Sequence, residues 1–215
     1  MAITLWGRAN SANVQKVRWA LAEIGLAYEH VPLGGRFGGN KDAAYLAMNP
    51  NGLVPTLRDG DLVLWESHEI VRYLAATYSA GHLWPVDPRA RAMVDQWTDW
   101  TATTFQPAWL GAFWQVVRTP ISEHNPSAIA KSLAASENCL SIMDGRLSKS
   151  PFLGGDQLTY ADLVAGVAMY LWSTMEIERA SHPAVEAWHR RLGERQAFRD
   201  NVAIDYSELV GRLAF

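Results

Sequence analysis

The chain has 215 residues, of which 49% are hydrophobic and 19% are charged, so it contains enough apolar side chains for a folded core and is not a disordered protein. Its net charge of −3 excludes a nucleic-acid-binding protein that depends on neutralising phosphates. Its one cysteine, Cys139, excludes an internal disulfide and a cysteine-based metal cluster. No secretion signal and no apolar run of membrane-spanning length is found, so we expect a cytoplasmic protein that does not bind membranes.

The first third of the chain alternates strand and helix signals. A short apolar run at 3–6 predicts a strand, and apolar residues at helical spacing from Val14 to Ile24, closed by Gly25, predict a helix. A second extended run follows at 27–33. This order predicts a βαβ unit, whose two strands run parallel in one sheet.

The next segments predict a hairpin and a further helix. Residues 43–48 predict a short helix, and 53–57 predict a strand that contains Pro55. The dipeptide at 59–60 (Asp-Gly) predicts a turn into a strand at 62–65. Ser67 is expected to cap a helix that ends near Tyr78. The expected N-terminal domain, residues 1–78, is therefore an α/β unit of order βαβ-α-ββα with a mixed sheet.

Beyond a predicted linker at 79–87, every strong signal is helical, so residues 88–215 are expected to form an all-α bundle domain. Asp87 and Asn125 each precede a proline, which is typical of a helix start. A seam with spacings of three and four follows from 129 to 147, and Cys139 beside it is expected to be a packing residue. The segment 158–163 (LTYADL) predicts a capping box between Thr159 and Asp162. The sequence does not place the segment after residue 200.

Several chemical motifs are missing. The glycine-rich loop at 34–39 does not match a phosphate-binding motif, the histidines form no metal-binding pair, and no G-x-S-x-G or C-x-x-C occurs. What remains is Ser11, at the predicted start of the first helix. It is either an ordinary capping serine or a residue that acts where a helix N-terminus favours anions, and 66–67 marks a second such place.

Four stretches together carry a family resemblance. They are 10–17 (NSANVQKV), 49–55 (NPNGLVP), 64–70 (LWESHEI) and 158–162 (LTYAD). The chain resembles the cytosolic glutathione transferases of the serine type, in the style of the theta-like and related bacterial classes, over its whole length. The resemblance implies a thioredoxin-like glutathione-binding domain followed by the helical domain.

The resemblance also implies roles for particular residues. Ser11 matches the catalytic serine, Val54 the residue whose backbone pairs with the cysteinyl part of glutathione, and Pro55 the family's cis-proline. Glu66 and Ser67 match the pair that binds the γ-glutamyl end. Asn40 and Lys41 fall where the family contacts the glycyl end, although Leu53 replaces a lysine found there in some theta-like members.

The function implied is the attack of the glutathione thiolate on a small apolar electrophile, with glutathione as co-substrate and no cofactor or metal. The electrophile is expected between residues 9–11 and the helix that carries Trp109, Phe113 and Trp114. A homodimer is also implied, and the apolar residues of the tryptophan-rich helix from Pro88 support it. Alternatives are a specialised isomerase, dehalogenase, ether-cleaving enzyme or peroxidase on the same fold, and a non-catalytic module that binds glutathione or another protein.

Overall fold

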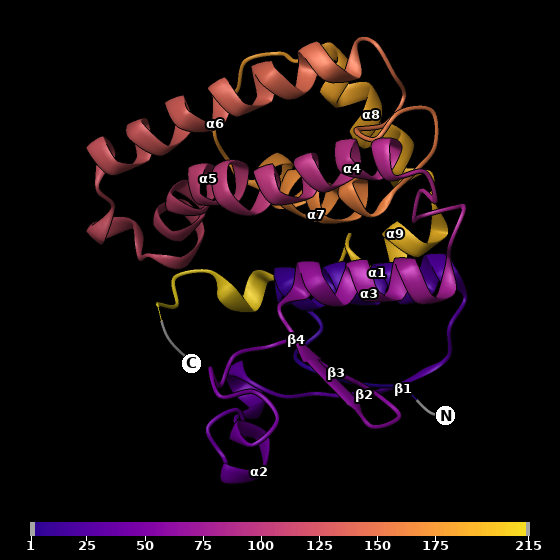
Figure 1. Cartoon of the computed structure of the whole chain (residues 1–215). Coiled ribbons are helices and arrows are strands. Elements are labelled where there is room, and N and C mark those ends of the chain that lie inside the picture. The colour runs from indigo at the N-terminus through magenta and orange to yellow at the C-terminus, as the bar shows by residue number, and fades with distance from the viewer. Residues whose placement is uncertain (1–2, 214–215) are drawn as a thin grey trace.

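The computed structural model describes residues 3–213, in which a four-stranded sheet and its helices lie below a stack of longer helices (Figure 1). The strand order is β2-β1-β3-β4. The central strand β1 (Ile3–Trp6) pairs parallel with β2 (Tyr28–Val31) and antiparallel with β3 (Thr56–Asp59), which continues through a hairpin into β4 (Leu62–Trp65). The mixed sheet expected from the sequence is confirmed.

Two helices cover the face of the sheet that is turned towards the helical stack. These are α1 (Ala12–Ile24) and α3 (Ser67–Tyr78), while the short α2 (Ala43–Leu46) lies apart from them, near the far edge of the domain (Figure 1). Gly25 ends α1 in the left-handed conformation with φ 78°, as its position after the apolar repeat predicted. Val14, Val17 and Leu21 are fully buried in the core, and α1 packs along α3.

Two local predictions were wrong. The third strand was expected at 53–57 but begins at Thr56, because Pro55 has no N–H to donate to a ladder and the extended segment before it forms a loop. Ser67 was expected to cap α3 but is its first residue, and the N-cap position is occupied by Glu66. The Ser67 hydroxyl donates instead to Oδ1 of Asn13, 3.3 Å away.

The helical part begins with one long helical path. It consists of α4 (Pro88–Trp100), a π-helical turn (Thr101–Phe105), α5 (Gln106–Phe113) and a second π-helical turn (Trp114–Arg118). After it come α6 (Pro126–Leu147), α7 (Tyr160–Thr174), α8 (Pro183–Gly193) and α9 (Gln196–Asn201). The predicted caps of α4 and α6 are confirmed, since Asp87 accepts a bond from the Ala90 amide and Asn125 from the Ala128 amide.

Helix α7 forms the centre of this stack, with nearly every residue buried. The predicted capping box at its start is present. Asp162 is fully buried, and its carboxylate accepts bonds from the amides of Thr159 and Leu153 at 2.9 Å and from the Trp188 indole at 3.0 Å. Through these bonds Asp162 connects the loop before α7 to α8. The several donors are needed because a buried carboxylate without hydrogen-bond partners is strongly destabilising. Cys139, beside the α6 seam, is buried, which agrees with its predicted packing role.

The two parts meet where α1 packs against α7 and α9. Trp19 of α1 is fully buried, and a Cβ on Gly166 of α7 would lie 2.9 Å from its ring, so only glycine permits this approach. Beside it, Glu23 accepts two bonds from the Arg195 guanidinium, at 2.7 and 2.5 Å. The segment 79–87, predicted from the sequence as a linker, is packed in the structure, since Trp84 stacks on Tyr160 with ring centroids 5.2 Å apart.

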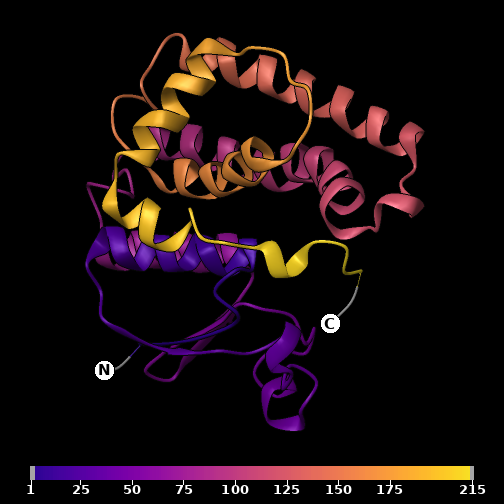
Figure 2. The ribbon, with the colours of Figure 1, turned by 180° about the vertical axis from the view of Figure 1, so that it is seen from behind.

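The chain beyond α9, which the sequence did not place, runs back along the junction between the two parts (Figure 2). It contains a short 3₁₀ turn (Ser207–Leu209). The amide of Gly211 donates to the Val117 carbonyl at 2.8 Å, which ties this segment to the end of the long helical path. Within residues 3–213, no helix is long and apolar enough to cross a membrane.

Candidate active site at the domain junction

Ser11 lies at the N-cap of α1 with extended backbone angles (φ −78°, ψ 125°). Its side chain makes no capping hydrogen bond to the helix, so it does not act as an ordinary capping serine. Only 8% of the residue is exposed. The hydroxyl is therefore held in a sheltered place, at a helix end whose free amides favour a negative charge.

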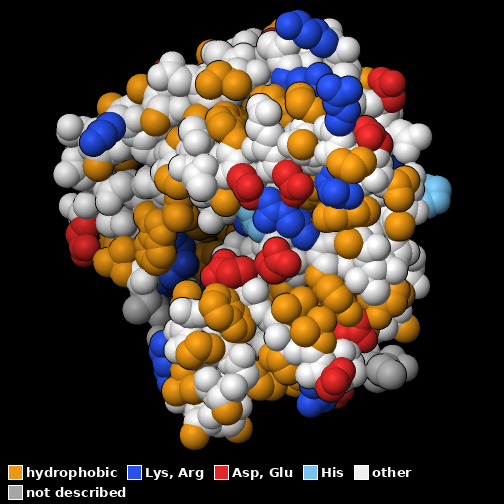
Figure 3. Space-filling view, in the orientation of Figure 1, with side chains coloured by type: hydrophobic (Ala, Val, Ile, Leu, Met, Phe, Trp, Pro, Cys, Tyr) orange, Lys and Arg blue, Asp and Glu red, His pale blue; other side chains and the backbone are white. Residues whose placement is uncertain are grey.

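A cavity of about 360 Å³ opens beside Ser11, between the two domains. The N-terminal domain contributes the start of α1 together with Leu53 and Val54, and the helical domain contributes an aromatic wall. That wall consists of Trp109, Phe113 and Trp114. Figure 3 shows a hollow between the two domains on one face, with basic and acidic side chains at its edge. The structure thus brings Ser11 and the three aromatic residues together at one cavity.

Leu53 and Val54, in the loop before β3, line the cavity beside Ser11. The Val54–Pro55 peptide bond is cis, which agrees with the expectation for Pro55. Val54 is half-buried and Leu53 is 65% exposed. Tyr45 and Asn49 both hold this loop from below, donating to the Leu53 carbonyl at 2.6 and 2.9 Å.

Glu66 and Ser67 lie at the start of α3, next to α1. Glu66 has φ 73°, and among residues 3–213 it is the only residue other than glycine with a positive φ. Such backbone strain is concentrated at binding and catalytic sites. Because the Ser67 hydroxyl donates to Asn13, two positions from Ser11, the two helix N-termini lie side by side.

Asn40 and Lys41 lie farther out. The Asn40 amide donates to the Gly52 carbonyl at 2.8 Å, and the exposed Lys41 ammonium donates to the Asn51 carbonyl at 3.4 Å. Both side chains connect the glycine-rich loop to the 49–52 turn. Neither lines the cavity beside Ser11.

A buried polar cluster beneath Ser11 was missed by the sequence analysis. The Lys16 ammonium, 1% exposed, donates to Oδ1 of Asn13 at 3.0 Å, to Oε1 of Gln106 at 2.8 Å and to Nε2 of His68 at 2.9 Å. The feature of the sequence that could have revealed this cluster is a lysine placed between the apolar residues Val14 and Val17 of the predicted helix. Three acceptors match its three N–H donors, which stabilises the charged form.

The pKa values in this cluster are strongly shifted. Burial lowers the pKa of Lys16 to about 7, although the nearby charge of Glu66 opposes the shift. Burial and then the charge of Lys16 lower the pKa of His68 to about 2, so His68 is neutral and its Nε2 can accept a hydrogen bond from the Lys16 ammonium. The cluster connects α1, α3 and α5 just below the cavity.

Two arginines were also missed. Arg8, in the loop before α1, and Arg118, at the end of the long helical path, both line the cavity beside Ser11. Arg118 is only 6% exposed, stacks 4.6 Å from the Trp114 ring centroid and donates from Nε to the Arg212 carbonyl at 2.5 Å. No periodic signal distinguishes these two residues in the sequence, because both lie at the ends of elements that only the fold brings together.

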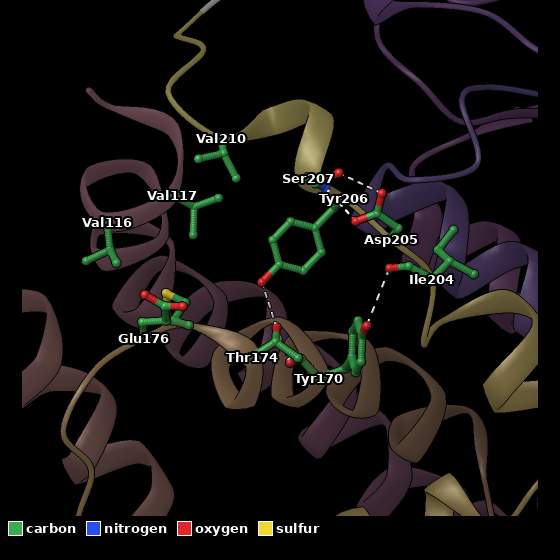
Figure 4. A pocket seen from close by; sticks show the side chains of 11 residues that line it. Val116, Val117, Tyr170, Thr174, Glu176, Ile204, Asp205, Tyr206, Ser207 and Val210 are labelled. Carbon is green, nitrogen blue, oxygen red and sulfur yellow. Dashed lines mark hydrogen bonds between the residues drawn. The ribbon is translucent and has the colours of Figure 1, made fainter. Parts of the chain in front are cut away.

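The C-terminal segment covers this region and separates it from a second cavity. Glu208 pairs with Arg36 at 3.0 Å and accepts a short bond from the Asn10 amide, so this segment contacts the residue next to Ser11. On its other side is a cavity of about 370 Å³, where the Tyr206 hydroxyl lies 2.8 Å from that of Thr174 (Figure 4). This second cavity contains none of the predicted site residues. Within residues 3–213, no group of side chains suited to a metal ion is found.

Comparisons with known proteins agree with this geometry. Residues 5–82 match the family model described as the N-terminal domain of glutathione S-transferase, and residues 102–196 match that of its C-terminal domain. The chain is 42% identical over 207 residues to glutathione S-transferase GstB of Escherichia coli (strain K12), covering 95% of this chain and 100% of that protein. It is 33% identical over 214 residues to a glutathione S-transferase of Hyoscyamus muticus, covering 97% and 100%.

Among solved structures, the theta-class glutathione S-transferase of Xanthomonas axonopodis pv. citri, with glutathione bound, superposes with a TM-score of 0.91. The two are 46% identical, over 95% of this chain and 98% of the other. A maize glutathione S-transferase in complex with an atrazine glutathione conjugate superposes with a TM-score of 0.84 at 29% identity, over 94% and 97%.

Proposed function

Because the chain belongs to the glutathione S-transferase family, we propose that Ser11 activates the glutathione thiol for attack on a small electrophile held in the cavity between the domains. Membership of the family establishes the transferase activity and glutathione as its co-substrate. The observation that carries the assignment of Ser11 is a sheltered serine hydroxyl that makes no capping bond, beside a cavity with an aromatic wall.

The energetics of this activation are sufficient. A free thiol has a pKa of about 8.5, so only a few per cent is ionised at neutral pH. Lowering that pKa by about two units requires roughly 2.7 kcal/mol in favour of the thiolate. A hydroxyl that donates to a charged acceptor contributes about 1.5–3 kcal/mol, and the N-terminus of α1 adds about 0.3–1 kcal/mol. No general base is needed.

The rest of glutathione is assigned to the N-terminal domain. The Val54 backbone, preceding Pro55, is proposed to pair with the cysteinyl unit, and Glu66 and Ser67 to bind the γ-glutamyl end. The strained backbone of Glu66 and its place beside the start of α1 support this assignment. Asn40 and Lys41 are proposed to contact the glycyl end of glutathione. Both residues already bond to carbonyls of the 49–52 turn.

The decisive experiment is to mix the purified protein with glutathione and a panel of aryl halides, enones and hydroperoxides, and to identify the products by mass spectrometry. Thioether conjugates would support the proposal. Glutathione disulfide from hydroperoxides would indicate a peroxidase, and an isomerised, dehalogenated or ether-cleaved product that retains no glutathione would indicate one of the specialised enzymes. Glutathione binding without turnover of any member would indicate a binding module.

A homodimer is proposed as the working form, although not for the reason that the sequence suggested. Trp97 and Trp109 of the long helical path are buried within the chain. The exposed apolar surface instead includes Leu62 (38%) and Trp65 (39%) on the edge strand β4. An apolar edge strand is normally covered, and a second copy would cover it.

This face also carries charges of both signs. Arg72 of α3 pairs with Asp95 at 3.0 Å and with Asp99, both of α4. Figure 3 shows acidic and basic side chains beside apolar areas on one face of the molecule. A face with both signs of charge can pair with its own copy across a two-fold axis. The cytoplasm is the proposed location, since reduced glutathione is abundant there and the one cysteine is buried as a free thiol.

A further inference from the structure

We propose that the glutathione thiolate accepts a second hydrogen bond, from the side-chain amide of Asn13, and that Lys16 is the residue that positions this amide. The inference rests on the proposed function, because it concerns the thiolate that the Ser11 hydroxyl is proposed to bind. Ser11 and Asn13 are then two catalytic residues that act on the same atom. Lys16 does not touch the substrate and acts through Asn13.

The first observation is where Asn13 lies. It belongs to the first turn of α1, two positions after Ser11, and it is half-buried. Both residues line the same cavity between the two domains. Asn13 therefore lies beside the proposed place of the sulfur, at a helix end that favours a negative charge.

The second observation is how the amide of Asn13 is oriented. Its Oδ1 accepts a hydrogen bond from the Lys16 ammonium at 3.0 Å and another from the Ser67 hydroxyl at 3.3 Å. An ammonium group has donors only, so the atom that faces Lys16 is the amide oxygen and not the amide nitrogen. Nδ2 is bonded to the same carbon atom and is directed away from Lys16. Lys16 thereby excludes the opposite orientation, in which the oxygen would repel a thiolate.

The third observation is that Nδ2 of Asn13 has no partner within the protein. Among residues 3–213, the hydrogen bonds of this side chain are both made by its oxygen. A donor in a sheltered cavity is stabilised by an acceptor, and a charged acceptor forms the stronger bond. The ammonium on the oxygen side also polarises the amide, which strengthens its N–H donors.

Lys16 is itself held by two further helices. It is 1% exposed, and its ammonium also donates to Oε1 of Gln106 in α5 at 2.8 Å and to Nε2 of His68 in α3 at 2.9 Å. Its three N–H donors are thus all used. The ammonium cannot turn away from Asn13 without leaving a buried donor unpaired, which is strongly unfavourable. The amide is therefore oriented before glutathione binds, and a donor fixed in advance stabilises a developing charge most effectively.

The variant Asn13→Ala tests the donor, with glutathione and S-methylglutathione as a pair of ligands. S-methylglutathione keeps both carboxylates and the ammonium group of glutathione, but its sulfur cannot form a thiolate. We expect the pKa of the bound glutathione thiol, followed by the ultraviolet absorbance of the thiolate, to rise by about 1, and kcat at neutral pH to fall about tenfold. The affinity for S-methylglutathione, measured by calorimetry, should change less than about twofold, because no contact remote from the sulfur is lost.

Two companion variants separate the donor from the surroundings of Ser11. Asn13→Asp keeps Lys16 buried with all three acceptors and replaces the N–H donors by a carboxylate oxygen, so the thiol pKa should rise further than in Asn13→Ala. Asn10→Ala removes an amide that also lines the cavity but donates to Glu208, so the thiol pKa should stay in place.

Lys16→Met tests the positioning role. We expect the same rise in the thiol pKa as in Asn13→Ala, with the affinity for S-methylglutathione retained. The double variant should show no larger rise than either single variant, because Lys16 acts through Asn13. Lys131→Met, which removes the same charge from the exposed surface of α6, is the control. Additive rises in the double variant would overturn the positioning role of Lys16.

The assignment of Asn13 can fail in two ways. An unchanged thiol pKa in Asn13→Ala would overturn it, and so would an equal loss of affinity for both ligands. The role of Ser11 is tested separately in Ser11→Ala. A rise in the thiol pKa in Asn13→Ala but not in Ser11→Ala would overturn the role of Ser11 and support this inference. The reverse result would overturn this inference and leave the proposed function intact.

Discussion

Ser11 can be tested by removing one oxygen atom. In Ser11→Ala the thiolate loses a donor worth roughly 1.5–3 kcal/mol, so we expect kcat at neutral pH to fall about tenfold to a hundredfold while glutathione affinity changes little. The loss should shrink above pH 9, because the thiol then ionises without help. The measurement is the pH profile of conjugation together with glutathione affinity from calorimetry.

Two neighbours serve as controls for that test, because both carry amide donors. The Asn10 side-chain amide donates to Glu208, and Oδ1 of the Asn13 side chain accepts from Lys16 and Ser67. A normal profile in Ser11→Ala with a defective one in Asn10→Ala or Asn13→Ala would move the role to the asparagine. Ser11→Cys should lose conjugation and form a mixed disulfide with glutathione, which adds a defined mass.

Glu66 and Ser67 belong to substrate binding in this proposal and not to the chemical step. We expect Glu66→Ala and Ser67→Ala to raise the KM for glutathione about tenfold with a smaller change in kcat, because both residues hold a part of glutathione remote from the sulfur. Steady-state kinetics with glutathione as the varied substrate check this. Lys41→Ala is a useful comparison at the other end of glutathione, and an unchanged KM in both Glu66 and Ser67 variants would remove them from the site.

At the scale of elements, helix α1 carries both residues of the proposed active site and residues that stabilise the packing of the two domains. Ser11 lies at its N-cap, and Lys16 lies on its buried face. Trp19 and Glu23, towards its C-terminal end, lie at the domain junction. One helix thus positions the hydroxyl, anchors the polar cluster and packs against α7. A change anywhere on its buried face is therefore expected to affect both activity and stability.

Lys16 makes the free energy of unfolding depend on pH. Its pKa falls to about 7 in the folded protein, compared with 10.5 for the ordinary side chain. Between those values the unfolded chain binds the proton and the folded chain does not, so this group makes the protein more stable as pH rises from 7 to 10. The limiting slope is about 1.4 kcal/mol per pH unit.

The comparison of wild type with Lys16→Met isolates that contribution. We expect the free energy of unfolding of the wild type to rise relative to that of the variant between pH 7 and 10, as measured by urea titration at each pH. A matched substitution, Lys131→Met on the exposed surface of α6, should leave the wild-type slope in place. Parallel curves for wild type and Lys16→Met would contradict the low pKa.

At the scale of the whole molecule, the exposed edge of the sheet predicts self-association. We expect light scattering at micromolar concentration to give twice the chain mass of 23.9 kDa. Trp65→Glu and Leu62→Glu should shift the protein towards the monomer, because a charge in an apolar interface is costly. Ile121→Glu, at a residue that is 86% exposed far from that strand, is the control. A monomeric wild type would contradict the proposal.

The sequence by itself determined the βαβ-α-ββα order of the N-terminal part, the parallel pairing of its first two strands, the antiparallel hairpin of its last two, and the caps of α4, α6 and α7. These features follow from local rules, namely apolar spacing, capping residues and turn dipeptides, together with the family resemblance. The strand start at Thr56 was misplaced because the same apolar run extends through a proline that cannot join the ladder.

Only the tertiary structure decided what surrounds Ser11. The Lys16 cluster takes one acceptor from each of α1, α3 and α5, and the cavity takes one arginine from each domain. Arg8 and Arg118 are 110 positions apart in the chain (118 − 8 = 110). Local patterns carry no information about such pairs, because they depend on how α1 packs against α7 and on where the chain after α9 returns. The set of side chains that line this cavity is therefore a property of the assembled fold.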